Sequence, residues 1–413
     1  MASKYQAPRG TFDVLPGQAH RRRRLERSAS EVFGRAGYEP IATPAFEGTD
    51  LFERGVGRST DIVRKEMFTF EDKGGRSLTL RPEGTASICR AYLEHGMQKL
   101  AQPVKLFYLG PFFRHERPQA GRYRQFHQLG VECIGTDSPL ADAEVIMLLA
   151  DLLGELGVPG VELRLGSLGS FEARRSYLED LKAHLHAHEG ELSRDVRERI
   201  DINPLRAFDA DDEGTRGVMA SAPTIVERLE GPDAEHFEEV RALLDAAGIA
   251  YAVDPTLVRG LDYYTRTIFS FVCDRLGAQS EIGGGGRYDG LVEQLGGAPT
   301  PAVGFAAGIE RILLALGEEG PAPERDAFVA VTDPGQRQRA MAIATQLRHA
   351  GLSAEVDLAG RGLKGQLKHA DRIGARRVLI LEESGAQIRD METGEQRPAD
   401  PGNLVEAMRG EGG

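Results

Sequence analysis

The sequence of 413 residues has no tryptophan and only three cysteines, Cys89, Cys133 and Cys273. The cysteines are far apart and form no CxxC pair or Cys/His cluster with zinc spacing, so we expect reduced, partly buried thiols in a cytoplasmic protein. No apolar run approaches the roughly 18 residues that a membrane-spanning helix needs. The basic cluster Arg21–Arg24 is not followed by an apolar segment, so we expect neither a signal peptide nor a membrane partner.

Two common nucleotide-binding loops are also absent. The sequence has neither GxxxxGK[ST] nor a strand–GxGxxG–helix unit, so a nucleotide would have to be held by side chains on a sheet. A net charge of -12 excludes a strongly basic nucleic-acid-binding protein, although a local basic patch could still contact RNA. The length predicts two or three domains.

The most informative stretch has the pattern of a long β-hairpin. Its two strands, Val104–Phe113 and Arg124–Ile134, are rich in aromatic and β-branched residues. Because side chains alternate between the faces of a strand, Gln128 and Glu132 share one face with a glycine between them. Core faces rarely carry Gln and Glu. We therefore predict a floor for a small polar ligand; a surface hairpin with solvated charges is the alternative.

The connection between these strands, RHERPQAGRY, is strongly basic. Arginines stand at Arg114, Arg117 and Arg122, and Arg124 follows directly. Guanidinium groups match the geometry of phosphate and carboxylate oxygens. The connection is therefore predicted to grip an anion at one end of the floor.

A second segment, Arg81–Thr85, ends a predicted strand and opens a predicted helix over Ala86–His95. Glu83 and Thr85 have two interpretations. They could cap the helix, each contributing roughly 0.5–1 kcal/mol, or they could hold a substrate ammonium group. The position alone favours the cap.

Two further segments follow much later in the chain. Arg259–Tyr264 reads RGLDYY, and residues 283–290 read GGGGRYDG. Four consecutive glycines let backbone approach a flat ligand or a neighbouring strand, with a loop as the alternative. In VGFAAGIER, Arg311 lies off the apolar stripe of its predicted helix and could equally be a surface arginine.

These motifs together resemble one enzyme family. Phe113-Arg114-His115-Glu116 resembles the second signature motif of class II aminoacyl-tRNA synthetases, and VGFAAGIER resembles the third. RPEGT, RGLDYY, GGRYDGL and RHERPQAGRYRQFHQLGVE resemble histidyl-tRNA synthetases in particular. The resemblance spans nearly the whole chain in family order and is weakest in the helical, charge-rich segment from about residue 171 to 251.

The resemblance implies a domain organisation. Residues 1–320 would form an α+β catalytic domain on an antiparallel sheet, with a helical insertion at about 171–251. A linker at 317–325 would lead to residues 326–413, which alternate strand and helix as in an α/β anticodon-binding domain with a mainly parallel sheet.

The resemblance also implies the reaction: activation of L-histidine by ATP, then transfer to tRNA(His). Arg114 would bind the α-phosphate of ATP, Glu116 the adenine amino group and Arg311 the γ-phosphate. Arg259 would bridge the substrate carboxylate and the α-phosphate, so Arg259 and Arg114 would be catalytic. Mg²⁺ would accompany ATP, with no ligands assigned.

The substrate histidine would be held by polar side chains. Its amino group would meet Glu83, Thr85 and Gln128, and its imidazole nitrogens Glu132 and Tyr264. The residues assigned to histidine binding are Glu83, Thr85, Gln128, Glu132, Arg259, Tyr263 and Tyr264. Such a site leaves polar groups unpaired with an apolar analogue, which can discriminate by roughly 10⁴–10⁵ without editing.

For the tRNA, the basic connection would meet the acceptor end and a C-terminal basic stripe the anticodon. The residues assigned to tRNA are Arg117, Gln119, Arg122, Arg361, Lys364 and Lys368. A homodimer is implied by the family. The alternatives are a regulatory subunit of ATP phosphoribosyltransferase and another class II synthetase. Arg259, Arg311 and the C-terminal domain argue against the first, and RGLDYY with GGRYDGL against the second.

Overall fold

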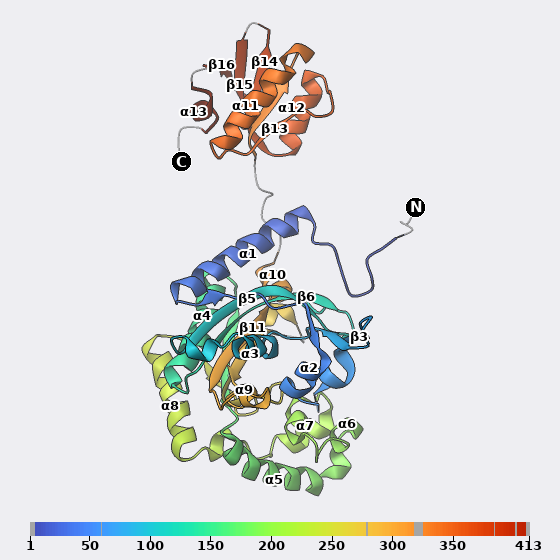
Figure 1. The fold of residues 1–413 in the computed structure, drawn as a ribbon, viewed down its shortest axis with the longest axis vertical. Helices are drawn as coiled ribbons and strands as arrows, with labels where there is room; N and C mark the ends of the chain where they lie inside the picture. Colours follow the sequence, from blue (N-terminus) through green and yellow to red (C-terminus); the bar gives the residue numbers. More distant parts are fainter. Residues whose placement is uncertain are drawn as a thin grey trace. The chain divides into compact units, whose positions relative to one another are not determined.

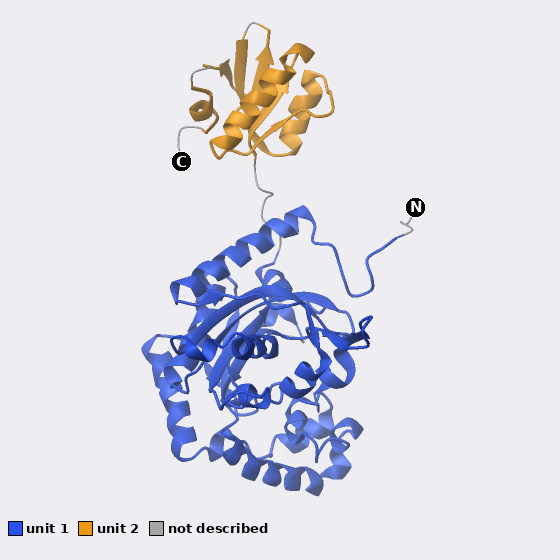
Figure 2. Cartoon of the chain, viewed as in Figure 1, with its two compact units in different colours: residues 1–318 blue, residues 319–413 orange. Residues whose placement is uncertain are grey.

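The computed structural model describes residues 5–58, 60–277, 280–317, 325–383, 385–400 and 403–409. The chain divides into two compact units, residues 1–318 and 319–413 (Figures 1 and 2). Each unit has its own sheet and hydrophobic core. Of the predicted linker, all but the first and last residues lie outside the described ones. No helix in the described part of the chain is long and apolar enough to cross a membrane.

The first unit is built on an eight-stranded sheet with the order β1-β5-β6-β11-β10-β9-β7-β8. The strands are β1 (Glu39–Pro40), β5 (Val104–Phe113), β6 (Gln125–Ile134), β7 (Val161–Ser167), β8 (Ala252–Val253), β9 (Thr265–Cys273), β10 (Glu281–Arg287) and β11 (Ala302–Gly308). β1 is parallel to β5 and β8 is parallel to β7, whereas the other neighbouring pairs are antiparallel. The predicted α+β fold and the predicted hairpin, β5 with β6, are confirmed.

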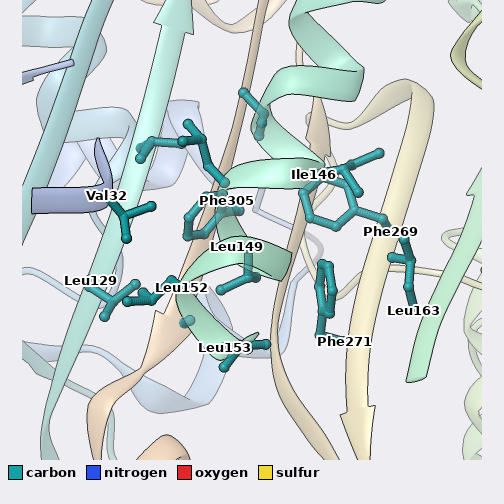
Figure 3. Close-up of a cluster of buried hydrophobic side chains, with 14 of the residues drawn as sticks. Val32, Leu129, Ile146, Leu149, Leu152, Leu153, Leu163, Phe269, Phe271 and Phe305 are labelled. Atoms are coloured by element: carbon teal, nitrogen blue, oxygen red, sulfur yellow. The ribbon is translucent and has the colours of Figure 1, made fainter. Parts of the chain in front are cut away.

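Helices cover one face of this sheet and bury their apolar sides against it. They are α1 (Pro16–Arg35), α4 (Pro139–Glu155), α8 (Gly231–Ala246) and α10 (Ile309–Leu316). Figure 3 shows Leu149 and Ile146 of α4 beside Phe305 and Phe269 of the strands. The apolar stripe in the sequence predicts a helix over His20–Gly37. α1 instead begins at Pro16, because proline suits the first turn of a helix.

The central strand β10 carries four consecutive residues without side chains. Residues 283–286 of β10 are all glycine and lie between β9 and β11. A Cβ atom on Gly285 would lie 1.9 Å from the backbone oxygen of Gly304, so no larger residue fits there. Arg287, at the end of this strand, is fully buried and donates to Asp142 of α4, which His236 of α8 also contacts at 3.3 Å.

The other face of the sheet carries smaller elements around a second cluster of buried side chains. They are α2 (Thr49–Gly55), a π-helical turn (Ile62–Glu66), α3 (Thr85–Glu94), a 3₁₀ turn (Met97–Lys99), α9 (Leu291–Gln294) and the three-stranded sheet β2 (Phe46–Gly48), β4 (Ser77–Leu80) and β3 (Phe68–Glu71). A further 3₁₀ turn, Asp274–Leu276, packs with α10 on the helix-covered face. All three cysteines of the chain are free thiols and buried. The face with the smaller elements contains the pocket described below.

The segment 171–251 is mostly helical, but its last helix belongs elsewhere. α5 (Phe171–Ala187), α6 (Arg194–Arg197), α7 (Glu213–Met219) and three 3₁₀ turns (Glu189–Glu191, Pro204–Asp209 and Val226–Arg228) share their own apolar cluster. α8 instead packs into the main core with α4. The helical cluster is joined to the rest of the first unit by polar as well as apolar contacts. Arg199 and Arg206 bind the Asp61 carboxylate, and Arg174 donates to the Tyr264 carbonyl at 2.7 Å.

The second unit has a five-stranded sheet in the order β13-β12-β14-β15-β16. Its elements are β12 (Arg325–Val331), a 3₁₀ turn (Pro334–Gln336), α11 (Arg337–His349), β13 (Ala354–Val356), α12 (Leu363–Arg372), β14 (Ala375–Glu382), β15 (Gly385–Asp390), β16 (Gln396–Pro398) and α13 (Leu404–Arg409). β13, β12 and β14 are parallel as predicted, whereas β15 and β16 are antiparallel. The expected parallel pattern missed this hairpin because its outer strand is fully exposed and carries no apolar alternation.

Candidate active site

One pocket on the open face of the large sheet gathers side chains from most of the predicted motifs. Its floor comes from β6, β10 and β11, and its walls come from residues 83–85, 114–123 and 259–264. The small residues Gly283, Gly284 and Gly304 leave the floor low, so a bound molecule can lie against backbone.

Three arginines from distant parts of the sequence line this single pocket: Arg114, Arg259 and Arg311. Arg259 forms an ion pair with Glu281, and Arg311 donates its Nε hydrogen to the backbone oxygen of the same glutamate. Arg114 donates its Nε hydrogen to the Pro82 carbonyl at 2.9 Å. The guanidinium groups are thus fixed before any ligand binds, which suits them to an anionic group with several oxygens.

The end of the pocket near the connection 114–124 combines charge with an aromatic surface. Arg114 lies 5.5 Å above the Phe126 ring. The Glu116 carboxylate lies 3.2 Å from the Arg122 guanidinium and 3.9 Å from that of Arg114. An aromatic face beside an arginine and a carboxylate can accept a flat ring that carries an amino group.

Glu83 both caps a helix and lines the pocket. Its two carboxylate oxygens accept the backbone N–H groups of Thr85 and Ala86 at 2.8 and 2.9 Å. The alternative cap by the Thr85 side chain is wrong, because its hydroxyl donates instead to Glu132 at 2.7 Å. Burial raises the pKa of Glu83, while the two backbone N–H groups oppose this rise.

Glu132 lies directly behind the pocket lining and is fully surrounded by protein. Its carboxylate accepts from the hydroxyl groups of Thr85 and Tyr288, which both line the pocket. Burial raises the pKa of Glu132 to about 8, although both hydroxyls favour the ionised form. Glu132 therefore changes its protonation state near neutral pH, as general acids, general bases and proton-sensitive binding groups do.

A group of tyrosines closes the deep end of the pocket. Tyr263 packs against Tyr264 and Tyr288 with ring centroids 4.8 and 5.7 Å apart, and burial raises the pKa of each phenol. The buried hydroxyl of Tyr108 and the buried side-chain oxygen of Gln128 have no hydrogen-bond partner among the described residues. Unpaired buried polar atoms that line a pocket point to a polar ligand.

The structure brings most of the residues predicted to bind ATP or histidine to this pocket. The predicted residues that line it are Glu83, Thr85, Arg114, Glu116, Arg122, Gln128, Arg259, Tyr263, Tyr264 and Arg311. Of the predicted residues, Glu132 reaches the pocket through Thr85 and Tyr288. Sequence reasoning missed Tyr108, Tyr123, Phe126, Glu281 and Tyr288, which also line it. The signal for Tyr108 was available, because it shares the face of its strand with the glycine opposite Gln128.

The residues predicted to meet tRNA lie in two places. Arg117 and Gln119 are exposed on the connection between β5 and β6 and are not part of the pocket lining. Arg361, Lys364 and Lys368 are exposed in or just before α12 of the second unit, where Arg361 pairs with Asp357 at 2.6 Å. In the described ranges, no group of three or more His, Cys, Asp or Glu residues could hold a metal ion.

Comparison with known proteins places the two units in known families. A family model described as histidyl-tRNA synthetase matches residues 10–312, and an anticodon binding domain matches residues 326–411. The first match covers more than half of the chain and contains every residue of the pocket. The chain belongs to the histidyl-tRNA synthetase family.

Relatives of this family match the chain over nearly its whole length. A histidine–tRNA ligase of Halothermothrix orenii is 48% identical and covers 98% of this chain and 99% of its own. One from Rubrobacter xylanophilus is also 48% identical and covers 98% and 100%. The agreement therefore includes the C-terminal unit as well as the pocket.

Solved structures show the same fold. The crystal structure of apo S. aureus histidyl-tRNA synthetase has a TM-score of 0.83 at 37% identity and covers 98% of this chain and all of its own. A structure described as an ATP phosphoribosyltransferase regulatory subunit/histidyl-tRNA synthetase from Bacillus halodurans has a TM-score of 0.67 at 25% identity and covers 89% of this chain. The likeness to a histidyl-tRNA synthetase is the stronger of the two in identity, coverage and TM-score.

Proposed function

We propose that this chain is a histidine–tRNA ligase: it joins L-histidine to ATP as histidyl-adenylate, releases pyrophosphate, and transfers histidine to the 3′ end of tRNA(His). The observation that carries the proposal is the single pocket that contains Arg114, Arg259 and Arg311 beside a tyrosine-lined polar cavity. Adenylate formation concentrates negative charge on one phosphorus centre, and fixed guanidinium groups stabilise that charge.

The nucleotide would bind at the end of the pocket near the connection 114–124. Arg114 would meet the α-phosphate and Arg311 the γ-phosphate. Glu116 would accept a hydrogen from the adenine amino group while Phe126 supports the ring. Arg259 would bridge the substrate carboxylate and the α-phosphate, where it can offset the charge that develops as the new bond forms. Arg259 and Arg114 are therefore the proposed catalytic residues.

The substrate histidine would bind at the deep end. Glu83 is held by backbone N–H groups and Gln128 has an unpaired oxygen, so both suit the substrate ammonium group, with Thr85 beside them. One imidazole nitrogen would meet Glu132, which lies just behind Thr85 and Tyr288 and whose carboxylate can accept a further hydrogen bond. The other nitrogen would meet Tyr264, with Tyr263 packed behind. A substrate without both nitrogens would leave buried polar groups unpaired, which is a strong basis for rejection.

Magnesium enters the proposal with ATP rather than as a resident ion. Mg²⁺ in nucleotide enzymes is held by phosphate oxygens with one or two carboxylates, and it keeps several waters. Glu281 and Glu116 line the pocket beside its arginines, and both already form ion pairs. The metal would add positive charge to the phosphates, whereas this chain's own residues would position them.

The tRNA would contact both units. Arg117, Gln119 and Arg122 would meet its acceptor end beside the pocket. Arg361, Lys364 and Lys368 would contact its anticodon end. Phosphate contacts of such residues position an RNA, while exposed bases identify it.

A homodimer is the proposed state of the protein. One face of the sheet β2-β4-β3 carries Phe46, Phe68, Phe70, Leu78 and Leu80 in paired register. Phe46 is 50% exposed and Phe70 is 43% exposed. An apolar sheet face of this kind favours association with a second copy of the chain.

The decisive test is amino-acid-dependent exchange of pyrophosphate into ATP, measured with each of the twenty amino acids. Exchange with histidine alone, followed by histidine transfer to tRNA(His), is expected. Exchange with a different amino acid would contradict the assigned substrate. Absence of exchange with every amino acid would instead favour a regulatory subunit of ATP phosphoribosyltransferase.

Arg259→Ala provides an internal test, with Arg164→Ala in β7, outside the pocket, as its control. The Arg259 side chain is 15% exposed and the Arg164 side chain 44%. Loss of exchange in the first variant alone would place the effect in the pocket rather than in a general loss of positive charge.

A further inference from the structure

The connection between β5 and β6, residues 114–124, forms one wall of the pocket and is held from two sides. On one side its tip packs against α10. A Cβ atom on Gly121 would lie 3.5 Å from Leu314 and 3.6 Å from Arg311. On the other side lies the start of the described chain, residues 5–15, which precedes α1 and which we call the N-terminal arm.

The N-terminal arm contacts the connection through backbone and through an aromatic pair. The Arg124 backbone N–H donates to the Gly10 carbonyl at 2.7 Å. The Phe12 and Tyr123 rings lie 4.5 Å apart. The two contacts use neighbouring residues of the arm and neighbouring residues of the connection. Together they fix both the distance between the two segments and their relative direction.

A tight turn brings the arm into this position. The Thr11 backbone N–H donates to the Pro8 carbonyl at 3.0 Å, and Gly10 has a φ of +86°. A Cβ atom on Gly10 would lie 2.7 Å from the Arg124 side chain. Both the backbone angle and the available space therefore require glycine at position 10.

The residues that the N-terminal arm contacts are also part of the pocket wall. Tyr123 lines the pocket itself. The Arg124 carbonyl accepts the Arg114 backbone N–H at 3.0 Å, and the Arg124 side chain donates toward the Glu116 carbonyl at 3.4 Å. The arm thus holds the segment that presents Arg114 and Glu116, the two side chains assigned to the nucleotide.

We infer that Phe12 and Gly10 are positioning residues for ATP: they order the pocket wall 114–124 without touching the substrate themselves. The inference rests on the proposed function for the identity of the nucleotide. It predicts a selective effect, because Gly10 and Phe12 contact Arg124 and Tyr123 of the wall, whereas the side chains assigned to histidine come mainly from β6 and from residues 83–85 and 259–264.

The first test measures equilibrium binding of ATP and of histidine to the full chain by titration calorimetry. Phe12→Ala should weaken ATP binding about three- to tenfold, the range that an aromatic pair supports, and leave histidine binding within about twofold of the wild type. Phe12→Tyr should restore ATP binding because it keeps the ring. Leu15→Ala, at an arm residue that is 63% exposed, is the control and should change neither.

The second test reads the order of the wall directly and needs no activity. The peptide bond after Arg122 is a trypsin site within the wall. Limited trypsin digestion with mass spectrometry should show faster cleavage there in Phe12→Ala and in Gly10→Ala, and slower cleavage when ATP is added to the wild type. These readouts remain valid if the exchange assay were to contradict the proposed substrate.

Unchanged ATP binding and unchanged cleavage after Arg122 in Phe12→Ala would refute the inference. Equal weakening of ATP and histidine binding, together with a lower melting temperature, would also refute it, because the arm would then act on the stability of the whole unit.

Discussion

Replacing Glu132 by glutamine tests whether a buried carboxyl group in this pocket keeps its proton at neutral pH. Glutamine has the same shape as the protonated acid. Because hydroxyl groups can donate or accept, the Thr85 and Tyr288 hydroxyls can each still form a hydrogen bond with the amide. Glu132→Gln should therefore preserve the fold while it removes the ionisable group.

The expected effect on stability follows from the raised pKa of Glu132, which changes from 4.5 to about 8 on folding. Below pH 4.5 both the folded and the unfolded protein hold this proton. As the pH rises toward 8, the unfolded chain loses the proton while the folded chain retains it, so folding becomes progressively less favourable. At about 1.4 kcal/mol per pH unit, the free energy of unfolding should fall by roughly 3 kcal/mol between pH 4.5 and pH 7 on account of this group.

Urea denaturation followed by circular dichroism, at several values from pH 5 to pH 8, measures this difference. The free energy of unfolding of Glu132→Gln relative to the wild type should increase with pH across the interval. In the variant Thr85→Val, which keeps Glu132, the decline in the free energy of unfolding should continue to higher pH, because the lost Thr85 hydroxyl lowers the pKa of Glu132. Parallel curves for Glu132→Gln and the wild type would refute the reasoning, because Glu132 would then titrate alike in both states.

Three further predictions concern the pocket, the sheet and the RNA. Arg259→Ala should abolish histidine-dependent pyrophosphate exchange while ATP binding stays measurable by calorimetry; near-normal exchange would remove Arg259 from catalysis. Gly285→Ala should lower the free energy of unfolding by about 3 kcal/mol or more, at or above the upper end for an overpacked site, whereas Gly190→Ala, in open space in the same unit, should have little effect in the same denaturation assay. The double variant Lys364→Ala with Lys368→Ala should weaken tRNA binding. It should also reduce the slope of the logarithm of the binding constant against the logarithm of the salt concentration by about 2; an unchanged slope would exclude phosphate contacts there.

Much of the fold could be predicted because its signals are local. The aromatic and β-branched residues of 104–113 predict a strand, and β5 has those bounds. The apolar stripe begins at Leu25 and gives no weight to Pro16, so the sequence indicates a start of α1 four residues later than the observed one. The hairpin of β15 and β16 was missed because neither strand shows a strong apolar alternation.

The candidate site divides in the same way. Arg114, Arg259 and Arg311 were predicted to share a pocket through family motifs, since no periodicity relates residues so distant in sequence. Tyr288 lies inside the segment GGRYDGL, but only the fold brings its hydroxyl to Glu132, so the sequence does not single it out. Long-range pairings of this kind decide which polar residues of a motif meet a substrate.

The glycine strand β10 has a consequence for how the floor of the pocket is secured. Side chains normally anchor a strand by interlocking with the layers above and below, and residues 283–286 have none to offer. Registration must then come from backbone hydrogen bonds on both edges and from the terminal Arg287, which is clamped to Asp142 in the helical layer. A mutation at Arg287 would therefore shift β10 and the pocket floor that it forms, although the Arg287 guanidinium group faces the helical layer and not the pocket.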